Sequence, residues 1–181
     1  LIGIKEEDTK SAKVINDVFD ELLADSTLSE KPLTSNDKAW CGALVYEVLT
    51  STNALDSIEK SGAKPNSLEA YSRVRAKEYL NVGTPTKEPK IGDIMVVSRE
   101  LNDKTQYHVA FYAGADKNGN VIMLGGNQRH TGTGGEVNFK TVTKNYTIHG
   151  YRRLENMADI KEATAAGYRA DYGVITEDSN I

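Results

Sequence analysis

The segment of residues 107–128 reads YHVAFYAGADKNGNVIMLGGNQ, and it decides the kind of fold that this chain can adopt. Two runs rich in β-branched and aromatic residues, 108–113 and 121–124, flank the polar stretch 116–120. The pair Asn118-Gly119 in that stretch is a strong hairpin signal, because both residues tolerate positive φ. We therefore predict an antiparallel hairpin whose turn is centred on this pair or one residue before it.

Similar runs recur on both sides of this hairpin, at 94–97, 137–142 and 147–154. Residues 91–154 are therefore predicted to form one antiparallel sheet. Apolar residues recur at the helical period at 8–24 and 39–51, and further candidate helices lie within 68–79 and near 157–166. The sequence predicts an α+β fold with three parts: an N-terminal helical segment (1–35), a main domain (36–154) and a tail with a short helix (155–181).

The composition is that of a globular protein and argues against a membrane-inserted protein and against a nucleic-acid-binding protein. Hydrophobic residues make up 39% and charged residues 27% of the 181 residues, an ordinary balance for a packed domain. No apolar run approaches the roughly 20 residues of a membrane-spanning helix, so we expect no membrane insertion. The net charge of −4, with Lys and Arg scattered, argues against nucleic-acid binding.

The start of the chain and its few Cys and His residues bear on processing, disulfide bonding and metal binding. The chain begins with Leu1 and lacks a signal-peptide pattern, so we expect a processed product or a piece of a longer protein. Its one cysteine excludes an intrachain disulfide. With only His108, His130 and His149 beside it, and no CxxC or HExxH, we predict no metal and no cofactor.

Cys41 is the candidate nucleophile because of its place in the predicted helix at 39–51. A lone cysteine is more often a small buried hydrophobe. With Asn36 or Asp37 as the N-cap, however, Cys41 falls in the first helical turn. Unpaired N–H groups and the positive end of the helix dipole favour a thiolate there and lower the thiol pKa. The same N–H groups can hold an oxyanion, so Cys41 is predicted to be a reactive thiolate.

His108 is the candidate base, and Asn127 is the residue expected to orient it. In the predicted hairpin Asn127 lies opposite His108 in one register and diagonal to it in the other. Its amide would fix the imidazole tautomer and leave the other ring nitrogen for the thiol. His130 and His149 have no partner that the sequence positions, so a structural interpretation is favoured for both. We predict that the Cys41 sulfur lies within a few ångströms of the His108 ring.

Several segments of the chain occur in the order of motifs found in one enzyme family. They are Trp40-Cys41-Gly42-Ala43-Leu44-Val45, Gly83-Thr84-Pro85, Glu88-Pro89-Lys90-Ile91-Gly92-Asp93-Ile94, His108-Val109-Ala110-Phe111-Tyr112, Leu124-Gly125-Gly126-Asn127-Gln128 and Gly150-Tyr151-Arg152-Arg153. Together they resemble CHAP-type amidase/peptidases, relatives of the NlpC/P60 peptidoglycan hydrolases in the papain-like superfamily. The chain departs from many relatives at Gly125, where they carry an acidic residue. Residues 35–37 are too poor in carboxylates for the calcium site of some relatives.

The resemblance implies a papain-like fold in which the nucleophile helix packs on an antiparallel sheet of about five to six strands. It also implies a Cys41–His108–Asn127 triad that hydrolyses an amide bond of peptidoglycan, within the stem peptide or between muramic acid and L-alanine. Such an enzyme would be secreted or virion-associated and would act in the periplasm or wall of a target bacterium. The side chains expected to hold the oxyanion or touch substrate are Asn36, Trp40, Tyr107 and Gln128.

Two alternatives stay open on the same fold. The first is a catalytically inactive wall-binding or structural phage-tail module, which would contact other phage structural proteins. The second is a different acyl-transfer enzyme, such as a toxin or a protein-modifying protease.

Overall fold

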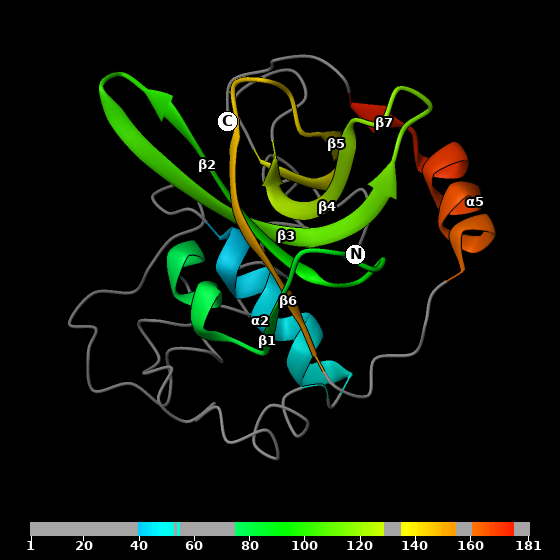
Figure 1. Cartoon of the computed structure of the whole chain (residues 1–181), viewed down its shortest axis with the longest axis horizontal. Coiled ribbons are helices and arrows are strands. Elements are labelled where there is room, and N and C mark those ends of the chain that lie inside the picture. Colours follow the sequence, from blue (N-terminus) through cyan, green and yellow to red (C-terminus); the bar gives the residue numbers. More distant parts are fainter. Residues whose placement is uncertain (1–39, 53, 55–74, 129–134, 155–160, 176–181) are drawn as a thin grey trace, which may run out of the picture.

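The computed structural model describes residues 40–52, 54, 75–128, 135–154 and 161–175 (Figure 1). The predicted helix at 8–24, the candidate residue Asn36 and most of the candidate helix within 68–79 lie outside these residues. No helix in the described ranges is long and apolar enough to cross a membrane.

The chain folds as an α+β protein around one seven-stranded sheet. Its helical elements are α2 (Cys41–Ser51), the 3-10 helix η3 (Ala76–Asn81) and α5 (Glu162–Tyr172). Its strands are β1 (Thr84–Thr86), β2 (Ile94–Leu101), β3 (Lys104–Ala115), β4 (Val121–Gln128), β5 (Glu136–Thr141), β6 (Thr147–Arg153) and β7 (Val174–Ile175). The five strands predicted over 91–154 are confirmed as β2 to β6.

Across the sheet the strand order is β1-β6-β2-β3-β4-β5-β7. Every neighbouring pair is antiparallel except β5 and β7, which are parallel. The two edge strands are not predicted from the sequence. β1 contains Pro85, which has no N–H for a central ladder and so suits an edge. β7 has two residues, which is too short for an alternating pattern to reveal.

The C-terminal tail belongs to the same folded unit as the sheet. Val174 of β7 pairs with Phe139 of β5, and Arg169 of α5 donates to the carbonyl of Ala113 on β3. The helix predicted near 157–166 begins and ends later, at Glu162–Tyr172.

The β3–β4 hairpin has one of the two predicted registers. Phe111 pairs with Leu124, as a turn centred one residue before Asn118-Gly119 requires, and that register is confirmed. The carboxylate of Asp116 holds the connecting loop, because its Oδ1 accepts from the N–H of Asn120 at 2.8 Å. The pairing of β4 with β5 then shifts in register between Gly125 and Gln128, so a regular ladder does not reach the end of β4.

The β2–β3 hairpin is tighter and is not predicted. Its turn residues Asn102 and Asp103 have φ of 50° and 58°, and both positive angles are those of a type I′ turn. Leu101 and Lys104 pair directly across it. Without a glycine, this turn gives a weaker sequence signal than Asn118-Gly119.

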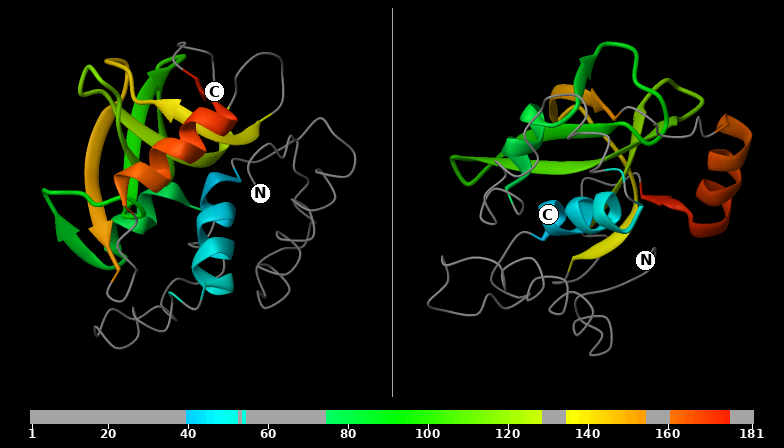
Figure 2. Two further views of the ribbon diagram at one scale, coloured as in Figure 1. Left: turned by 90° about the vertical axis from the view of Figure 1, so that its right-hand side faces the viewer. Right: turned by 90° about the horizontal axis from the view of Figure 1, so that it is seen from below.

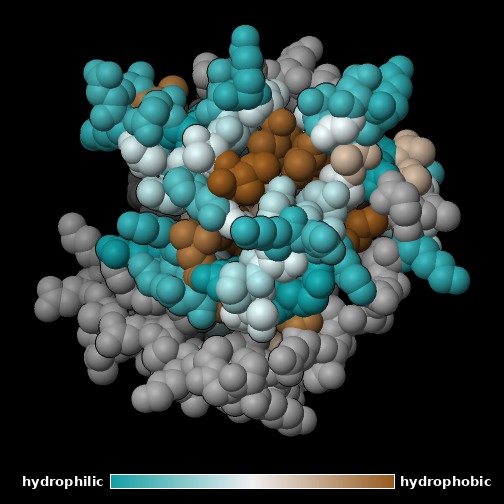
Figure 3. Space-filling model, viewed as in Figure 1, coloured by the Kyte–Doolittle hydropathy of each residue, from teal (hydrophilic) through white to brown (hydrophobic). Residues whose placement is uncertain are grey.

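Helix α2 packs on one face of the sheet (Figure 2), so each strand has a helix-covered face and an opposite face. The helix-side core includes Cys41, Val45, Val96, Val109 and Phe111. The cluster on the other face contains Met95, Val97, Ala110 and Met123. The two clusters divide β2 and β3 residue by residue, because successive side chains of a strand point to opposite faces. Figure 3 shows apolar side chains at the centre of one face of the molecule, bordered by hydrophilic ones.

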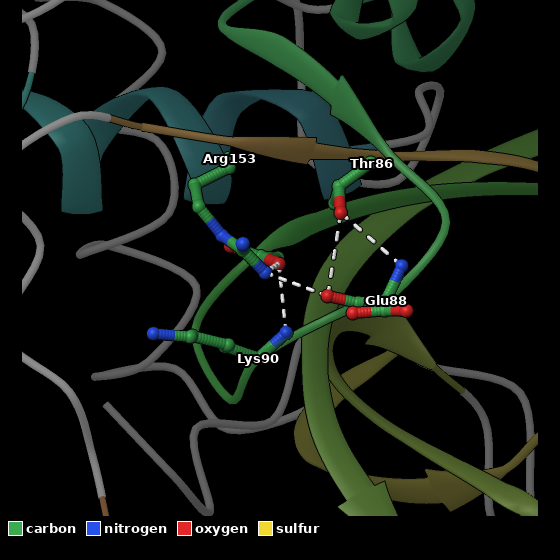
Figure 4. A network of polar contacts seen from close by, with 5 residues as sticks. Thr86, Glu88, Lys90 and Arg153 are labelled. Atoms are coloured by element: carbon green, nitrogen blue, oxygen red, sulfur yellow. Dashed lines mark hydrogen bonds and ion pairs between the residues drawn. The ribbon is translucent and has the colours of Figure 1, made fainter.

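An ion pair ties the segment before β2 to β6 (Figure 4). Arg153 Nη2 lies 2.8 Å from Asp93 Oδ2 and donates to the Glu88 carbonyl at 2.7 Å. The same Asp93 oxygen accepts from the Lys90 N–H at 2.8 Å. These contacts give the Glu88–Asp93 and Gly150–Arg153 motifs a structural role at the edge of the sheet.

Candidate functional site

Cys41 is the first residue of α2, within the helix that the sequence predicts. The N-cap is Trp40 rather than the predicted Asn36 or Asp37, and its side chain forms no capping hydrogen bond, so the first-turn N–H groups are left for other acceptors. The N–H groups of Val109 on β3, of Gly42 and of Cys41 itself meet the sulfur and act to lower its pKa. The expected support for a thiolate from the helix start is therefore present.

Burial nevertheless decides the charge of the thiol. The Cys41 side chain is 2% exposed. Moving a thiolate from water into this core costs more than the three N–H groups return, so burial raises the pKa of Cys41 above its ordinary 9.0. The predicted thiolate is wrong for this structure, in which Cys41 is a neutral thiol at pH 7.

His108 directly precedes Val109 on β3, and its side chain leaves the strand on the face away from α2. Two adjacent glycines of β4 locate it. A Cβ on Gly125 would lie 3.1 Å from His108 Nε2, whereas a Cβ on Gly126 would lie 2.8 Å from Leu44 Cδ2 of α2. Successive Cβ positions of a strand point to opposite faces, so the imidazole and α2 lie on opposite faces of the sheet.

The predicted contact between the sulfur and the imidazole is not formed. The sulfur meets the backbone of Val109, and His108 is one residue away along the same strand. Strand alternation is the reason: Val109 shares a core cluster with Cys41, so the neighbouring side chain points to the other face. Among the described residues, His108 Nε2 is buried and has no hydrogen-bond partner.

The surroundings of the His108 ring keep it uncharged. Its side chain is 4% exposed. Burial first and the charge of Lys140 second lower the pKa of His108 from 6.5 to about 4. The Gln128 side chain, as a hydrogen-bonding neighbour, opposes them, and the charge of Arg99 lowers the pKa by a smaller amount. A buried imidazolium beside two cations is costly, so the ring is neutral at pH 7 and able to accept a proton.

Gln128 rather than Asn127 is the amide beside the ring. The Cβ position of Gly125 that lies 3.1 Å from His108 Nε2 lies 3.4 Å from Gln128 Cδ. Asn127 has a φ of 57° and turns its amide oxygen toward Gly135, within the segment where the register of β4 shifts. The predicted His108–Asn127 contact is not formed, because this irregularity breaks the alternation on which it depended.

The carboxamide of Gln128 is held by its nitrogen. Nε2 donates to the Asn138 carbonyl at 2.6 Å and to the Gly125 carbonyl at 3.0 Å. Its Oε1 is buried without a hydrogen-bond partner in the described part of the chain. The amide oxygen and the imidazole Nε2 therefore lie buried beside Gly125 without a hydrogen bond of normal geometry, although the Gln128 side chain is close enough to the ring to raise its pKa.

Two of the other predicted substrate contacts, Trp40 and Tyr107, are packing residues. Trp40 is 2% exposed and packs its ring against Gly126, so it is a core residue here. Tyr107 is half-buried and packs against the core that contains Cys41. Asn36 and His130 lie outside the described residues.

Two residues near the site are not predicted from the sequence. Lys140 is 1% exposed on β5, although a charged residue in an alternating strand pattern normally indicates a solvent-facing position. Tyr79 of η3 is fully buried and donates from its hydroxyl to the carbonyl of Gly42 at 2.8 Å. It braces the first turn of α2, and no spacing in the sequence relates it to Cys41.

Comparison with known proteins identifies no relative of this chain. No family model matches it, and no match was found among curated proteins or solved structures.

Proposed function

We propose that this chain is a cysteine-dependent peptidoglycan hydrolase of papain-like fold, with Cys41 as nucleophile and His108 as base. The observation that carries this function is the buried His108 Nε2, which has no hydrogen-bond partner in the described residues. It lies on the residue next to Val109, whose N–H meets the Cys41 sulfur. Leaving a buried polar group unpaired costs about 1–3 kcal/mol, and catalytic use is one reason for a protein to keep such a group.

Proton transfer has to accompany the attack, because both groups are neutral at rest. The Cys41 thiol gives its proton to the unprotonated His108 nitrogen as the sulfur bonds to the substrate carbonyl carbon. The N–H groups of Cys41 and Gly42, which face the sulfur at rest, then donate to the oxyanion. His108 returns the proton to the leaving amine, and water attacks the acyl-enzyme with His108 again as base. The sulfur and the ring lie on opposite faces of the sheet, so the first step requires a rearrangement of the helix start or of β3 that brings both groups to one side.

The substrate class comes from the motifs, because the geometry of the site alone fits any amide. The ordered motifs from Trp40 to Arg153 resemble those of CHAP-type amidase/peptidases, which cleave peptidoglycan. The bond would lie within the stem peptide or between muramic acid and L-alanine. The enzyme would work in the wall or periplasm of a target bacterium, as a secreted or virion-associated protein. The Gln128 amide lies beside the His108 ring, where the sequence predicts Asn127.

A catalytically inactive wall-binding or structural module is the second candidate function. The sealed Cys41 thiol, its raised pKa and the placement of His108 on the other face favour it. Such a module would keep the fold and bind wall polymer or other phage structural proteins without cleaving them.

One experiment separates these two functions. Purified protein is incubated with insoluble peptidoglycan, and turbidity and newly released amines are followed for the wild type and for Cys41→Ala. The hydrolase predicts clearing by the wild type and its loss in the variant, with an unchanged circular dichroism spectrum. No clearing by the wild type, with retained binding to the pellet, favours the inactive module. Mass spectrometry of the released fragments identifies the bond.

A further inference from the structure

A second group of polar and aromatic side chains lies on the helix-covered face of the sheet, beyond Cys41. Ser98 Oγ on β2 lies 2.7 Å from His149 Nε2 on β6. The His149 ring lies 5.1 Å from the Tyr107 ring on β3, tilted by 37°. Lys77 of η3 places its Nζ 5.5 Å from the centroid of the same Tyr107 ring. We call Lys77, Tyr107 and His149 the platform.

The platform is built by an irregularity of the sheet. Val96 pairs with Gly150 but Val97 pairs with Ile148, so His149 is the extra residue of a bulge between β2 and β6. A bulge re-aims the side chain that it carries. Ser98 is 5% exposed and holds the ring by one nitrogen. If the Ser98 hydroxyl donates to Nε2, the ring proton is on Nδ1, where it is available to a ligand.

The platform is accessible and cationic. Lys77 and His149 are exposed, and Tyr107 is half-buried. Within the described ranges Lys77 contacts the Tyr107 ring and forms no ion pair, and no carboxylate bonds to His149. An ammonium and an imidazole N–H beside an aromatic surface suit a ligand that carries a carboxylate next to an aliphatic group.

The platform is close enough to Cys41 to contact the same substrate. Tyr107 and Val109 are two residues apart on β3 and share a face, and the Val109 N–H meets the Cys41 sulfur. Two residues of a strand span about 7 Å, which is also the length of about two residues of an extended peptide. A peptide with its scissile carbonyl at Cys41 therefore brings a group about two residues away over the platform.

We propose that the platform binds a free carboxylate of the peptide substrate, about two residues from the bond that Cys41 attacks. This inference rests on the proposed function and adds to it a preference for stem peptides with an unmodified acidic residue. Lys77 and the His149 N–H hold the carboxylate, and the Tyr107 ring packs against the adjoining aliphatic carbons. Ser98 is a positioning residue, because it acts through His149.

Binding is measured in the Cys41→Ala protein, so that cleavage does not intervene. The ligands are a synthetic stem peptide with free carboxylates and the same peptide with every carboxylate amidated, and the dissociation constants come from NMR titration. Adding Lys77→Gln should weaken binding of the free-acid peptide about fivefold, the effect of one exposed charge pair of about 1 kcal/mol. Binding of the amidated peptide should not change. Lys117→Gln, in the loop after β3, is the matched control and should change neither.

Three results would contradict the proposed role of the platform. They are equal affinity of both peptides for the Cys41→Ala protein, an unchanged dissociation constant when Lys77→Gln is added, and absence of any peptide binding. The proposed function is judged separately by wall clearing with the wild type. If the wild type clears the wall and Lys77→Gln does not change peptide binding, only the platform proposal is contradicted. If peptide binding depends on Lys77 but the wild type does not clear the wall, only the hydrolase proposal is contradicted.

Discussion

The two faces of β3 put opposite surroundings around adjacent residues. On one face Val109 packs with Cys41 in an apolar core below α2. On the other face His108 lies beside Gln128 and within reach of the charge of Lys140. Both candidate catalytic groups are neutral at pH 7: burial raises the pKa of the Cys41 thiol, and burial with nearby cations lowers the pKa of the His108 imidazole. Adjacent residues of β3 therefore contact or carry two groups whose pKa values are shifted in opposite directions, the thiol upward and the imidazole downward.

The largest expected effect concerns the helix-covered face. Because the Cys41 thiol is buried and protonated, iodoacetamide should modify it about 100-fold or more slowly in the folded protein than in urea at the same pH. Mass spectrometry of quenched samples gives both rates. Similar rates in the two states would mean that the thiol is open to solvent, and the contrast between the faces would be lost.

The two faces should also separate in the pH dependence of stability. The pKa of His108 is about 4 in the folded state and 6.5 ordinarily, so the unfolded state binds a proton first as pH falls. Stability contributed by the neutral ring is complete above pH 6.5 and is lost toward pH 4, by about 3 kcal/mol at about 1.4 kcal/mol per pKa unit. The raised pKa of Cys41 predicts a second loss above pH 9, where the unfolded thiol ionises first.

Urea unfolding across this pH range measures both losses. His108→Gln should flatten the acidic one and Cys41→Ala the alkaline one, each leaving the other in place. An acidic loss of the same size in His108→Gln would assign it to other groups.

Substituting the adjacent glycines Gly125 and Gly126 of β4 adds a methyl group toward one face of the sheet or the other, and so tests the two faces separately. A Cβ on Gly126 would lie 2.8 Å from Leu44 Cδ2, so Gly126→Ala should push α2 outward and lower stability by about 1–3 kcal/mol. Gly125→Ala places its methyl group 2.9 Å from Ala110 Cβ and 3.1 Å from His108 Nε2. It should shift the His108 ring resonances and leave the rate of Cys41 alkylation unchanged. Faster alkylation in Gly125→Ala than in Gly126→Ala would contradict the assignment of the faces.

The smallest expected effect is a change in stability in α5, away from both faces of β3. Gly167 is inside α5, and a Cβ there meets nothing within 4 Å. Gly167→Ala should raise the free energy of unfolding by about 0.5–1 kcal/mol, because alanine loses less backbone entropy in a helix. A decrease in the melting temperature would show that α5 is not helical in solution.

Much of the sheet could be predicted because its strands follow a period of two. The runs that became β2 to β6 alternate or are continuously apolar, and the Asp116–Asn120 loop carries a strong turn signal. The edge strands β1 and β7 could not be predicted, since three and two residues are too few to show a period. The Asn102-Asp103 turn was missed because no glycine marks it.

The candidate site depends on two features that no local sequence pattern predicts. The β3–β4 register is one of the two that were predicted, and extending it to the end of β4 places Asn127 opposite His108. The positive φ of Asn127 and the shift in register bring Gln128 to the ring instead. Irregularities of this kind depend on how β4 packs against β5, which a single sequence does not encode locally. Similarly, the place of Cys41 in the first helical turn was predicted, but the burial that raises its pKa depends on tertiary packing.

The central proposal is that Cys41 of α2 and His108 of β3 act as one unit although the sulfur and the imidazole lie on opposite faces of the sheet. The most direct measurement is the rate of peptidoglycan solubilisation by Cys41→Ala, His108→Ala and the double variant, each with its folding checked. We predict that either single change reduces the rate about 10³-fold or more and that the double change reduces it no further, because residues of one catalytic unit are not additive. Clearing that survives His108→Ala, or losses that multiply in the double variant, would contradict it.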